Sequence, residues 1–186
     1  MQRRFAIYLV LSQSIAAAAA GTVNGPPPQA AAKPPTTPAN LNCPGSEYAQ
    51  FKFMLGSWRV GPTGKVKTPA ASSWTTLGPC AILEHWMPKN GGDGFSLNYF
   101  DQADRKWHQH WVDATGDAVD YIGRWTGTTM QFTADDVATP QMTRVKLTMT
   151  FEPLANGRVR QYGTQSTDGG KTFAPAFDFT YVPRKA

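Results

Sequence analysis

Segments in which apolar and polar residues alternate recur along the chain, and this pattern constrains the fold more than any other feature. In the clearest one, residues 144–151, every odd-numbered position is apolar and every even-numbered position is polar. A repeat of two is typical of a β-strand with one buried face. We expect about ten such strands, at residues 55–60, 72–77, 80–87, 94–100, 106–113, 118–125, 128–133, 144–151, 158–165 and 173–182.

Turn residues separate these segments, and no long helix is encoded. The Asn-Gly pair at 156–157 is a strong signal for a tight hairpin. One short helix is expected from Ser46, which can cap it, to Phe53, because Tyr48 and Phe51 fall on one side. We therefore predict an all-β fold: an antiparallel up-and-down barrel of about 8–10 strands that closes its own edges, with a short N-terminal helix.

The first 42 residues have the composition of an export signal followed by a spacer. Residues 1–20 contain two arginines, an apolar run and an alanine-rich end, as a secretory signal peptide does. Residues 21–42 are rich in proline and alanine, which predicts a disordered tether. The expected barrel domain occupies residues 43–186. An uncleaved anchor is the alternative to cleavage, and the mature protein is expected to have no transmembrane segment.

The chain has two cysteines, Cys43 and Cys80. In an oxidising compartment this count favours a disulfide between them, the alternative being one buried and one exposed thiol. No C-x-x-C pair is present, so the sequence predicts neither a zinc ribbon nor a thioredoxin or haem-attachment motif. The signal peptide and the disulfide together predict an exported protein, either periplasmic or secreted.

The charge is spread along the chain. The formal net charge is +5, but the basic residues alternate with aspartates and form no basic run or basic helix. A nucleic acid or an anionic membrane surface is therefore not an expected partner.

Two neighbouring segments, residues 94–100 and 106–113, are rich in aromatic residues and are expected to form a hairpin. With Phe100 placed opposite Lys106, one face becomes apolar apart from the amide of Gln109. A sheet of this kind buries its apolar face. We predict a ligand cavity against it, to which other strands contribute. The expected ligand-binding residues are Trp86, Phe95, Tyr99, Trp107, Gln109, Trp111 and Tyr162.

Gln109 is the reason for placing a ligand at this face. A lone amide between Trp107 and Trp111 costs free energy unless it is hydrogen-bonded. It should therefore meet a polar side chain, a trapped water molecule or the polar end of a ligand. Glu84 and Arg160 are the candidate protein partners.

The opposite face of the same hairpin offers a competing polar site, formed by Ser96, Asn98, His108 and His110. Two histidines on one face of a strand can reach one metal ion, but zinc needs a third protein ligand. His85 or a carboxylate is the candidate for that third ligand. The simpler interpretation bonds the two histidines to the serine and the asparagine. We predict no metal site, and favour this face only for binding that depends on a metal or changes between about pH 5 and 8.

No sequence motif identifies a catalytic site. Ser96 near His110, with Asp113 or Asp120, lacks the G-x-S-x-G elbow that presents a nucleophilic serine. An acid–base pair of Glu84 with a histidine is likewise supported by no sequence motif. We predict no catalytic residues and no cofactor, and expect a protein that binds a small molecule. A hydrolase- or isomerase-type enzyme that uses the cavity and a structural or partner-binding module are the alternatives; no protein partner is identified.

Residues 166–173, Ser-Thr-Asp-Gly-Gly-Lys-Thr-Phe, resemble the Asp-box of sialidase-type propellers. Propellers need many copies of this motif, and the chain has one. Asp168 can accept backbone N–H bonds while the glycines adopt left-handed angles. We therefore predict a hairpin closure at this position and not a sialidase site.

The order of several short motifs resembles a known family. Gly56-x-Trp58 resembles the start of lipocalins and related calycin barrels, in which the tryptophan plugs the closed end, and the lipocalin arginine over it would correspond to Arg160 or Arg184. The wider order is similar to a family of secreted bacterial domains of unknown function, thought to be calycin-like, and spans residues 43–184. The resemblance implies fold and compartment and brings no activity or catalytic residue. The motifs that carry it lie at residues 53–58, 83–86, 96–99, 106–113, 158–161 and 166–173.

Overall fold

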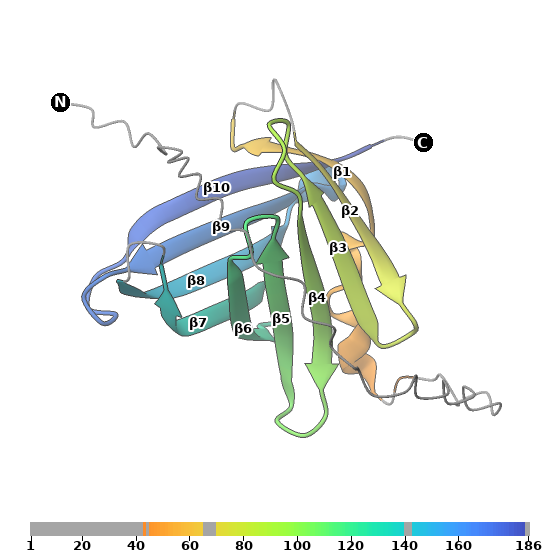
Figure 1. Cartoon of the computed structure of the whole chain (residues 1–186). Coiled ribbons are helices and arrows are strands. Elements are labelled where there is room, and N and C mark those ends of the chain that lie inside the picture. Colours follow the sequence, from red (N-terminus) through yellow and green to blue (C-terminus); the bar gives the residue numbers. More distant parts are fainter. Residues whose placement is uncertain (1–42, 44, 65–69, 140–142, 185–186) are drawn as a thin grey trace, which may run out of the picture. The chain divides into compact units, whose positions relative to one another are not determined.

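In the part of the chain that the computed structural model describes, ten antiparallel strands follow one another and close into a barrel (Figure 1). Each strand pairs with the strands before and after it, and the last strand pairs with the first. The prediction of an all-β, antiparallel, up-and-down barrel is confirmed. The strands are β1 (Gly56–Pro62), β2 (Ala70–Leu77), β3 (Ala81–Met87), β4 (Gly94–Asp101), β5 (Lys106–Asp113), β6 (Ala118–Trp125), β7 (Met130–Ala138), β8 (Arg144–Pro153), β9 (Val159–Ser166) and β10 (Ala174–Pro183).

The predicted signal peptide, residues 1–20, and the predicted tether, residues 21–42, lie outside the part of the chain that the structure describes. Within the described part, no helix is both long enough and apolar enough to cross a membrane. The described residues are 43, 45–64, 70–139 and 143–184.

One strand is longer than its sequence pattern predicts. β7 continues to Ala138, beyond residues 128–133 that the sequence pattern predicts for this strand. The register shifts between Ala134 and Val137, and Asp136 adopts a positive φ of 58° at this bulge. Pairing with β8 then resumes. A bulge interrupts the alternation of buried and exposed positions, so the sequence pattern ends before the strand does.

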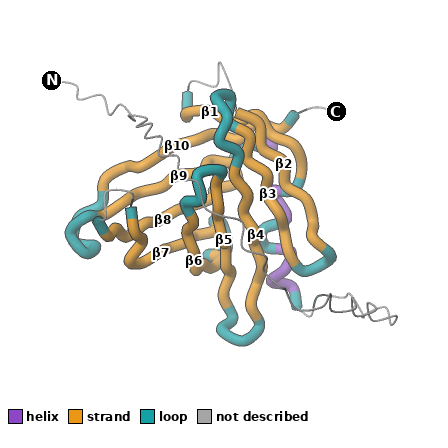
Figure 2. Tube along the Cα trace, viewed as in Figure 1, coloured by secondary structure: helices purple, strands orange, loops and turns teal. Residues whose placement is uncertain are grey.

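The expected N-terminal helix is formed by two short 3₁₀ turns, η1 (Ser46–Ala49) and η2 (Lys52–Met54). Figure 2 shows both turns in purple beside the barrel strands. Phe51 lies between the turns, and the side chains of Phe51 and Met54 are fully buried. We call residues 46–54 the plug, because these apolar side chains fill one end of the barrel. A third 3₁₀ turn, η3 (Ala155–Gly157), connects β8 to β9.

The ring of Phe51 is the centre of an aromatic cluster. Its centroid lies 5.1 Å from that of Phe151 and 5.5 Å from that of Trp74. The rings of Trp107 and Phe132 also contact it, so one side chain of the plug touches β2, β5, β7 and β8. Such ring pairs stabilise the fold beyond the burial of their area. We call this cluster, with Met54 and Met130, the filled half of the barrel.

Two further contacts hold the plug in place. Trp58, the tryptophan of the G-x-W motif, is buried, and its Nε1 donates to the backbone oxygen of Met54 over 2.8 Å. The predicted disulfide between Cys43 and Cys80 is present, with the Cα atoms 5.3 Å apart, and joins the chain before the plug to the turn that precedes β3. Of the described residues, no arginine makes a cation–π contact with Trp58.

The hairpin of β4 and β5 is shifted by one residue from the predicted register. Phe100 pairs with Trp107, and Lys106 pairs with Asp101. The loop between the strands is shorter than expected because Arg105 adopts a positive φ of 60°, which lets the chain reverse earlier. A one-residue shift moves every side chain of a strand to the opposite face.

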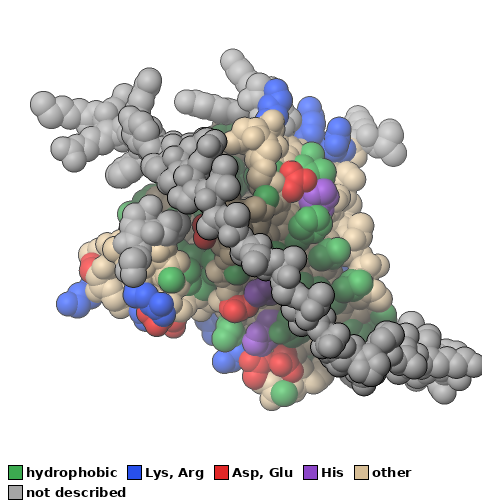
Figure 3. All heavy atoms as spheres, viewed as in Figure 1, with side chains coloured by type: hydrophobic (Ala, Val, Ile, Leu, Met, Phe, Trp, Pro, Cys, Tyr) green, Lys and Arg blue, Asp and Glu red, His purple; other side chains and the backbone are tan. Residues whose placement is uncertain are grey.

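The shift exchanges the two faces of β4. Ser96 and Asn98, predicted to lie on the outer face, are fully buried inside the barrel. Phe95 and Tyr99, predicted to lie inside, are on the outside, where each stacks on a histidine ring. Figure 3 shows hydrophobic and histidine side chains together on the outer surface of this part of the barrel. The predicted faces of β4 are therefore wrong, whereas the inward face of β5 is as predicted.

Candidate functional site

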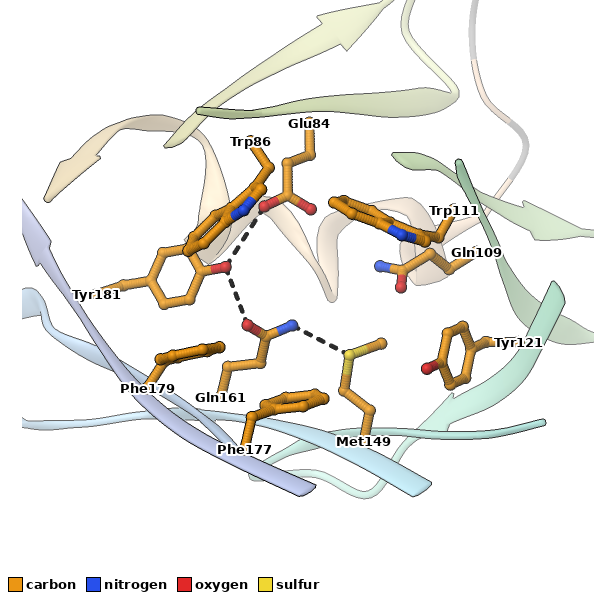
Figure 4. A pocket seen from close by; sticks show the side chains of 10 residues that line it. All are labelled: Glu84, Trp86, Gln109, Trp111, Tyr121, Met149, Gln161, Phe177, Phe179 and Tyr181. Atoms are coloured by element: carbon orange, nitrogen blue, oxygen red, sulfur yellow. Dashed lines mark hydrogen bonds between the residues drawn. The ribbon is translucent and has the colours of Figure 1, made fainter. Parts of the chain in front are cut away.

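Beyond the filled half, the barrel interior contains a cavity of about 300 Å³, which we call the open half. The described residues of its walls come from six strands, β3, β5, β6, β8, β9 and β10, and Figure 4 shows their side chains. Most are aromatic or amide side chains. The lining residues are Glu84, Trp86, Gln109, Trp111, Tyr121, Met149, Gln161, Phe177, Phe179 and Tyr181.

The cavity includes part of the predicted ligand-binding set. Trp86, Gln109 and Trp111 line it. Trp107 instead packs against the plug in the filled half. Three further members, Phe95, Tyr99 and Tyr162, do not line the cavity; the first two stack on histidines outside the barrel, and the third lies beneath the guanidinium of Arg160.

Two glycines within strands shape the cavity wall. A Cβ atom on Gly94 would lie 2.3 Å from the ring of Trp111, and one on Gly163 would lie 2.4 Å from the ring of Phe177. Real Cβ atoms do not approach other atoms so closely, so each ring occupies the space that a side chain on the neighbouring strand would take. The absence of a side chain at these two positions therefore fixes where two aromatic rings of the cavity lie.

Glu84 is the only carboxyl group among the residues that line the cavity, and it is 3% exposed. Ser72 Oγ donates to its Oε1 over 3.0 Å, and Ser96 Oγ donates to its Oε2 over 2.9 Å. The hydroxyl of Tyr181 lies 3.4 Å from Oε1 and 3.0 Å from Oε1 of Gln161, so its single proton is shared between these two acceptors. Three strands that flank or face β3 thus direct hydroxyl groups at one carboxyl group.

The two serine hydroxyls are held as donors toward Glu84. Trp74 Nε1 donates to Ser72 Oγ, and Asn98 Nδ2 donates to Ser96 Oγ, each over 2.9 Å. An indole N–H and an amide NH₂ can only donate, so each serine oxygen accepts from them and its own proton is free to point to the carboxyl group. The network is therefore arranged for Glu84 as a hydrogen-bond acceptor, which is the role of the ionised form.

None of the described side chains that line the cavity is basic, so none of them balances a charge on Glu84. Burial raises the pKa of Glu84 from 4.5 to about 7, against the opposing effect of the three hydroxyl groups. Arg160 is not its partner. Arg160 makes two hydrogen bonds to Asp178, over 2.9 and 2.7 Å, at a partly exposed position. Glu84 therefore changes between its neutral and ionised forms near pH 7 with no ionic partner in the cavity.

Gln109 is hydrogen-bonded to a polar side chain, as predicted, although the partner is neither of the two expected residues. Its Nε2 donates to Asn98 Oδ1 over 2.7 Å, across the β4–β5 pair. Its Oε1 and the hydroxyl of Tyr121 have no hydrogen-bond partner among the described residues. No completely buried side-chain oxygen or nitrogen in the described part of the chain lacks a partner, so both oxygens are accessible from the cavity.

Aromatic rings enclose these polar groups. The centroid of Trp86 lies 5.9 Å from that of Phe179 and 6.5 Å from that of Tyr181. Phe177 and Phe179 stack on each other at 5.5 Å. Figure 4 shows the carboxyl group of Glu84 between the indole rings of Trp86 and Trp111. The cavity therefore combines broad aromatic surfaces with one acidic group.

The competing polar site is not assembled in the structure. Ser96 and Asn98 face the interior, whereas His108 and His110 face outward and bond to Asp104 and Asp120 over 2.9 and 2.5 Å. The expected bonds from these histidines to the serine and the asparagine are therefore absent. A pair of Ser96 with His110, or of Glu84 with either histidine, is also ruled out because the barrel wall separates the groups.

The Asp-box-like segment closes the hairpin of β9 and β10, as predicted. Asp168 Oδ1 accepts bonds from the backbone N–H groups of Lys171 and Thr172, each over 2.9 Å. Thr172 Oγ1 donates to Oδ2 over 2.6 Å, and these bonds hold the pKa of Asp168 well below its usual value. Both oxygens of the Asp168 carboxylate therefore accept hydrogen bonds from the turn itself.

Several cavity residues were missed by the sequence prediction, although their pattern was present. Phe177, Phe179 and Tyr181 occupy alternate positions of the last strand, and Met149 lies on the apolar side of the 144–151 alternation. The alternation identifies them as inward-facing. It does not show which inward positions reach the cavity and which are covered by the plug.

No protein-family model matches the chain, and a search of curated proteins finds no significant relative. The closed antiparallel barrel is compatible with the calycin-like fold that the sequence resemblance implies.

Proposed function

We propose that the protein is an exported binding protein that holds one small, partly apolar molecule in the open half of the barrel. The observation that carries this proposal is the cavity itself. One end of the interior is packed with aromatic rings, whereas the other holds about 300 Å³ of space bordered by polar atoms without protein partners. A concave, largely apolar site with a few polar groups is the usual form of a small-molecule site.

The size of the cavity limits the ligand. Its volume of about 300 Å³ is at the lower end of the range for small-molecule sites. Because a water molecule takes about 30 Å³, the space corresponds to about ten water molecules, or to a ligand of about ten to fifteen non-hydrogen atoms. A compound with one aromatic ring and a short polar chain has this size.

Export is supported by the disulfide and by the composition of residues 1–20. Disulfides persist in oxidising compartments, and the pair Cys43–Cys80 is formed in the structure. The mature protein is expected to begin near Gly21. The intact mass of periplasmic or secreted material, measured before and after reduction and alkylation, tests both statements, and a mass that includes residues 1–20 would contradict cleavage.

The binding proposal is tested with two small neutral probes, indole and 2-phenylethanol, followed by calorimetry and by tryptophan fluorescence. We expect saturable binding of one molecule per chain. Phe177→Ala should weaken this binding by about tenfold, because it removes a wall of the cavity. Phe95→Ala is the matched control, since Phe95 is 43% exposed on the outside. Equal effects of both substitutions, or no saturable binding to the wild-type protein, would contradict the proposal.

Acid–base catalysis is the second candidate, and the raised pKa of Glu84 is the observation that favours it. A carboxyl group with a pKa of about 7 can act as a general acid or base at neutral pH. In this case bound probes or related esters would be converted to products, which NMR spectra of the mixture would show. Glu84→Gln would abolish the conversion, whereas a pure binding protein would return every probe unchanged.

A further inference from the structure

We propose that the ligand carries a positively charged amine or ammonium group that pairs with Glu84, while its apolar part lies against the aromatic walls. This inference rests on the proposed function, because it names the chemistry of the ligand for the same cavity. It follows from the charge, the hydrogen-bond directions and the ring arrangement of the open half.

Glu84 has no counter-ion among the described residues that line the cavity. The protons of Ser72 and Ser96 are directed at Glu84 because Trp74 and Asn98 donate to the two serine oxygens. The carboxyl group is therefore set up as an acceptor, yet no basic residue lines the cavity. A buried charge without a partner is destabilising, and an ammonium group, which only donates hydrogen bonds, supplies both the opposite charge and the missing donors.

Aromatic rings surround the carboxyl group of Glu84. Figure 4 shows Glu84 between the indole rings of Trp86 and Trp111, with the ring of Tyr181 beside it. The hydroxyl of Tyr181 lies 3.4 Å from Glu84 Oε1, so this ring is at the same place in the cavity. The faces of aromatic rings attract cations, and tryptophan does so best. A cation placed at Glu84 is thus favoured by the carboxylate and by the rings together.

Other ligand charges fit the cavity less well. A carboxylate or phosphate ligand would face Glu84 with no basic side chain to bind it. A neutral ligand would leave the charge of Glu84 uncompensated above pH 7. The accessible oxygens of Gln109 and Tyr121 can accept further N–H or O–H groups. Beside the indole N–H donors of Trp86 and Trp111, the open half thus offers several acceptors to a donor-rich, cationic ligand.

Proton release is a consequence that can be measured. The other titratable groups in the cavity are the hydroxyls of Tyr121 and Tyr181, and burial raises the pKa of both, so they stay neutral near pH 7. The groups that contact Glu84 from β2, β4 and β10 are the hydroxyls of Ser72, Ser96 and Tyr181. A cation selects the ionised form of Glu84, so binding at or below pH 7 displaces its proton. Affinity should therefore rise with pH up to about 7 and then level off.

The experiment compares three probes of one shape: 2-phenylethylamine, 2-phenylethanol and phenylacetate. Each is titrated into the full-length mature protein by calorimetry between about pH 6 and 8, a range in which a primary amine stays protonated. We expect the amine to bind at least about tenfold more tightly than the alcohol at pH 8, and phenylacetate to bind most weakly. The affinity for the amine should fall by up to about tenfold for each pH unit well below 7, whereas that for the alcohol should not fall.

Glu84→Gln tests the residue, because the amide keeps the shape and removes the charge. It should abolish the preference for the amine and the pH dependence while the alcohol still binds. Glu152→Gln, on β8, is the matched control at a residue outside the cavity lining and should change neither. Should Glu84→Gln fail to fold, titration of the wild-type protein in two buffers of different ionisation enthalpy still measures the proton released with the amine.

The outcomes separate this inference from the proposed function. The inference of a cationic ligand is wrong if the alcohol binds saturably and the amine binds no better, or if phenylacetate binds most tightly. In both cases the proposal that the cavity binds a small molecule is still supported. The same conclusion follows if the amine binds without releasing a proton at pH 7. If none of the three probes binds saturably to the wild-type protein, both proposals fail.

Discussion

The two halves of the barrel interior differ in whether the indole nitrogens of their tryptophans are hydrogen-bonded to the protein. In the filled half, the indole nitrogens of Trp58, Trp74 and Trp107 each donate a hydrogen bond to a protein oxygen. In the open half, those of Trp86 and Trp111 have no such partner among the described residues. The filled half is thus complete without a ligand, and the open half is not. The difference teaches that aromatic content alone does not show whether a barrel interior is a core or a site.

The largest expected effect is on the filled half. Phe51→Ala should lower the free energy of unfolding by about 3 to 5 kcal/mol, because Phe51 is fully buried and contacts rings from four strands. Phe177→Ala should cost clearly less, since that ring borders empty space. Chemical denaturation of both variants measures the difference. Equal losses of stability would remove the distinction between the two halves.

The disulfide should have the next largest effect, because it fastens the plug to the barrel. Cys43 and Cys80 are 37 residues apart, and closing a loop of this length stabilises a fold by about 3 to 4 kcal/mol in the entropic account. The double substitution to serine should therefore lower the free energy of unfolding by about this amount. Affinity for a probe in the open half should change little. A loss of binding in a folded double variant would show that the halves are coupled.

Glu84 should make the open half sensitive to pH. Its pKa is 4.5 when unfolded and about 7 when folded, so the folded state binds this proton more tightly. The resulting stability is fully present below pH 4.5 and is lost as the pH rises through about 7; at about 1.4 kcal/mol for each pH unit it amounts to about 3 kcal/mol. The difference in free energy of unfolding between the wild type and Glu84→Gln should change by this amount from pH 4 to 8. A difference that stays constant with pH would contradict the raised pKa.

Gln109→Leu should have the smallest effect of the four. It removes the donor to Asn98 Oδ1, a fully buried acceptor, which costs about 1 to 3 kcal/mol. Gln131→Leu, at an exposed position on β7, is the matched control. Thermal unfolding curves of the two variants give the comparison. A stabilised Gln109→Leu variant would mean that the cavity already provides water to Asn98.

The strand pattern predicted much of the fold because it depends on local alternation. In β8 the apolar positions face inward along nearly the whole strand, as the sequence indicates. In β4 the prediction failed, because both faces carry aromatic residues and the register depends on the φ angle of Arg105 in the loop. A sequence pattern contains no information on that angle. The inward polar residues of β4 were therefore assigned to the wrong face.

The candidate site was predicted only in part for a different reason. Trp86, Gln109 and Trp111 were identified from a single hairpin and its surroundings, and these side chains line the cavity. Closure of the barrel adds residues from β6, β8, β9 and β10, and the position of Phe51 decides that Trp107 belongs to the core. Both effects come from contacts between segments far apart in the chain, which alternation does not reveal.

Methionine methyl NMR tests most directly whether only the open half accepts a ligand. Met149 lines the cavity, whereas Met54 and Met130 are fully buried in the filled half, so three residues of one type report on both halves. Protein labelled with ¹³C at its methionine methyl groups, with signals assigned by single substitutions to leucine, is titrated with 2-phenylethylamine. A saturable shift of the Met149 signal with unchanged Met54 and Met130 signals is the predicted result. Binding detected by calorimetry that leaves the Met149 signal in place, or moves all three signals equally, would contradict the account.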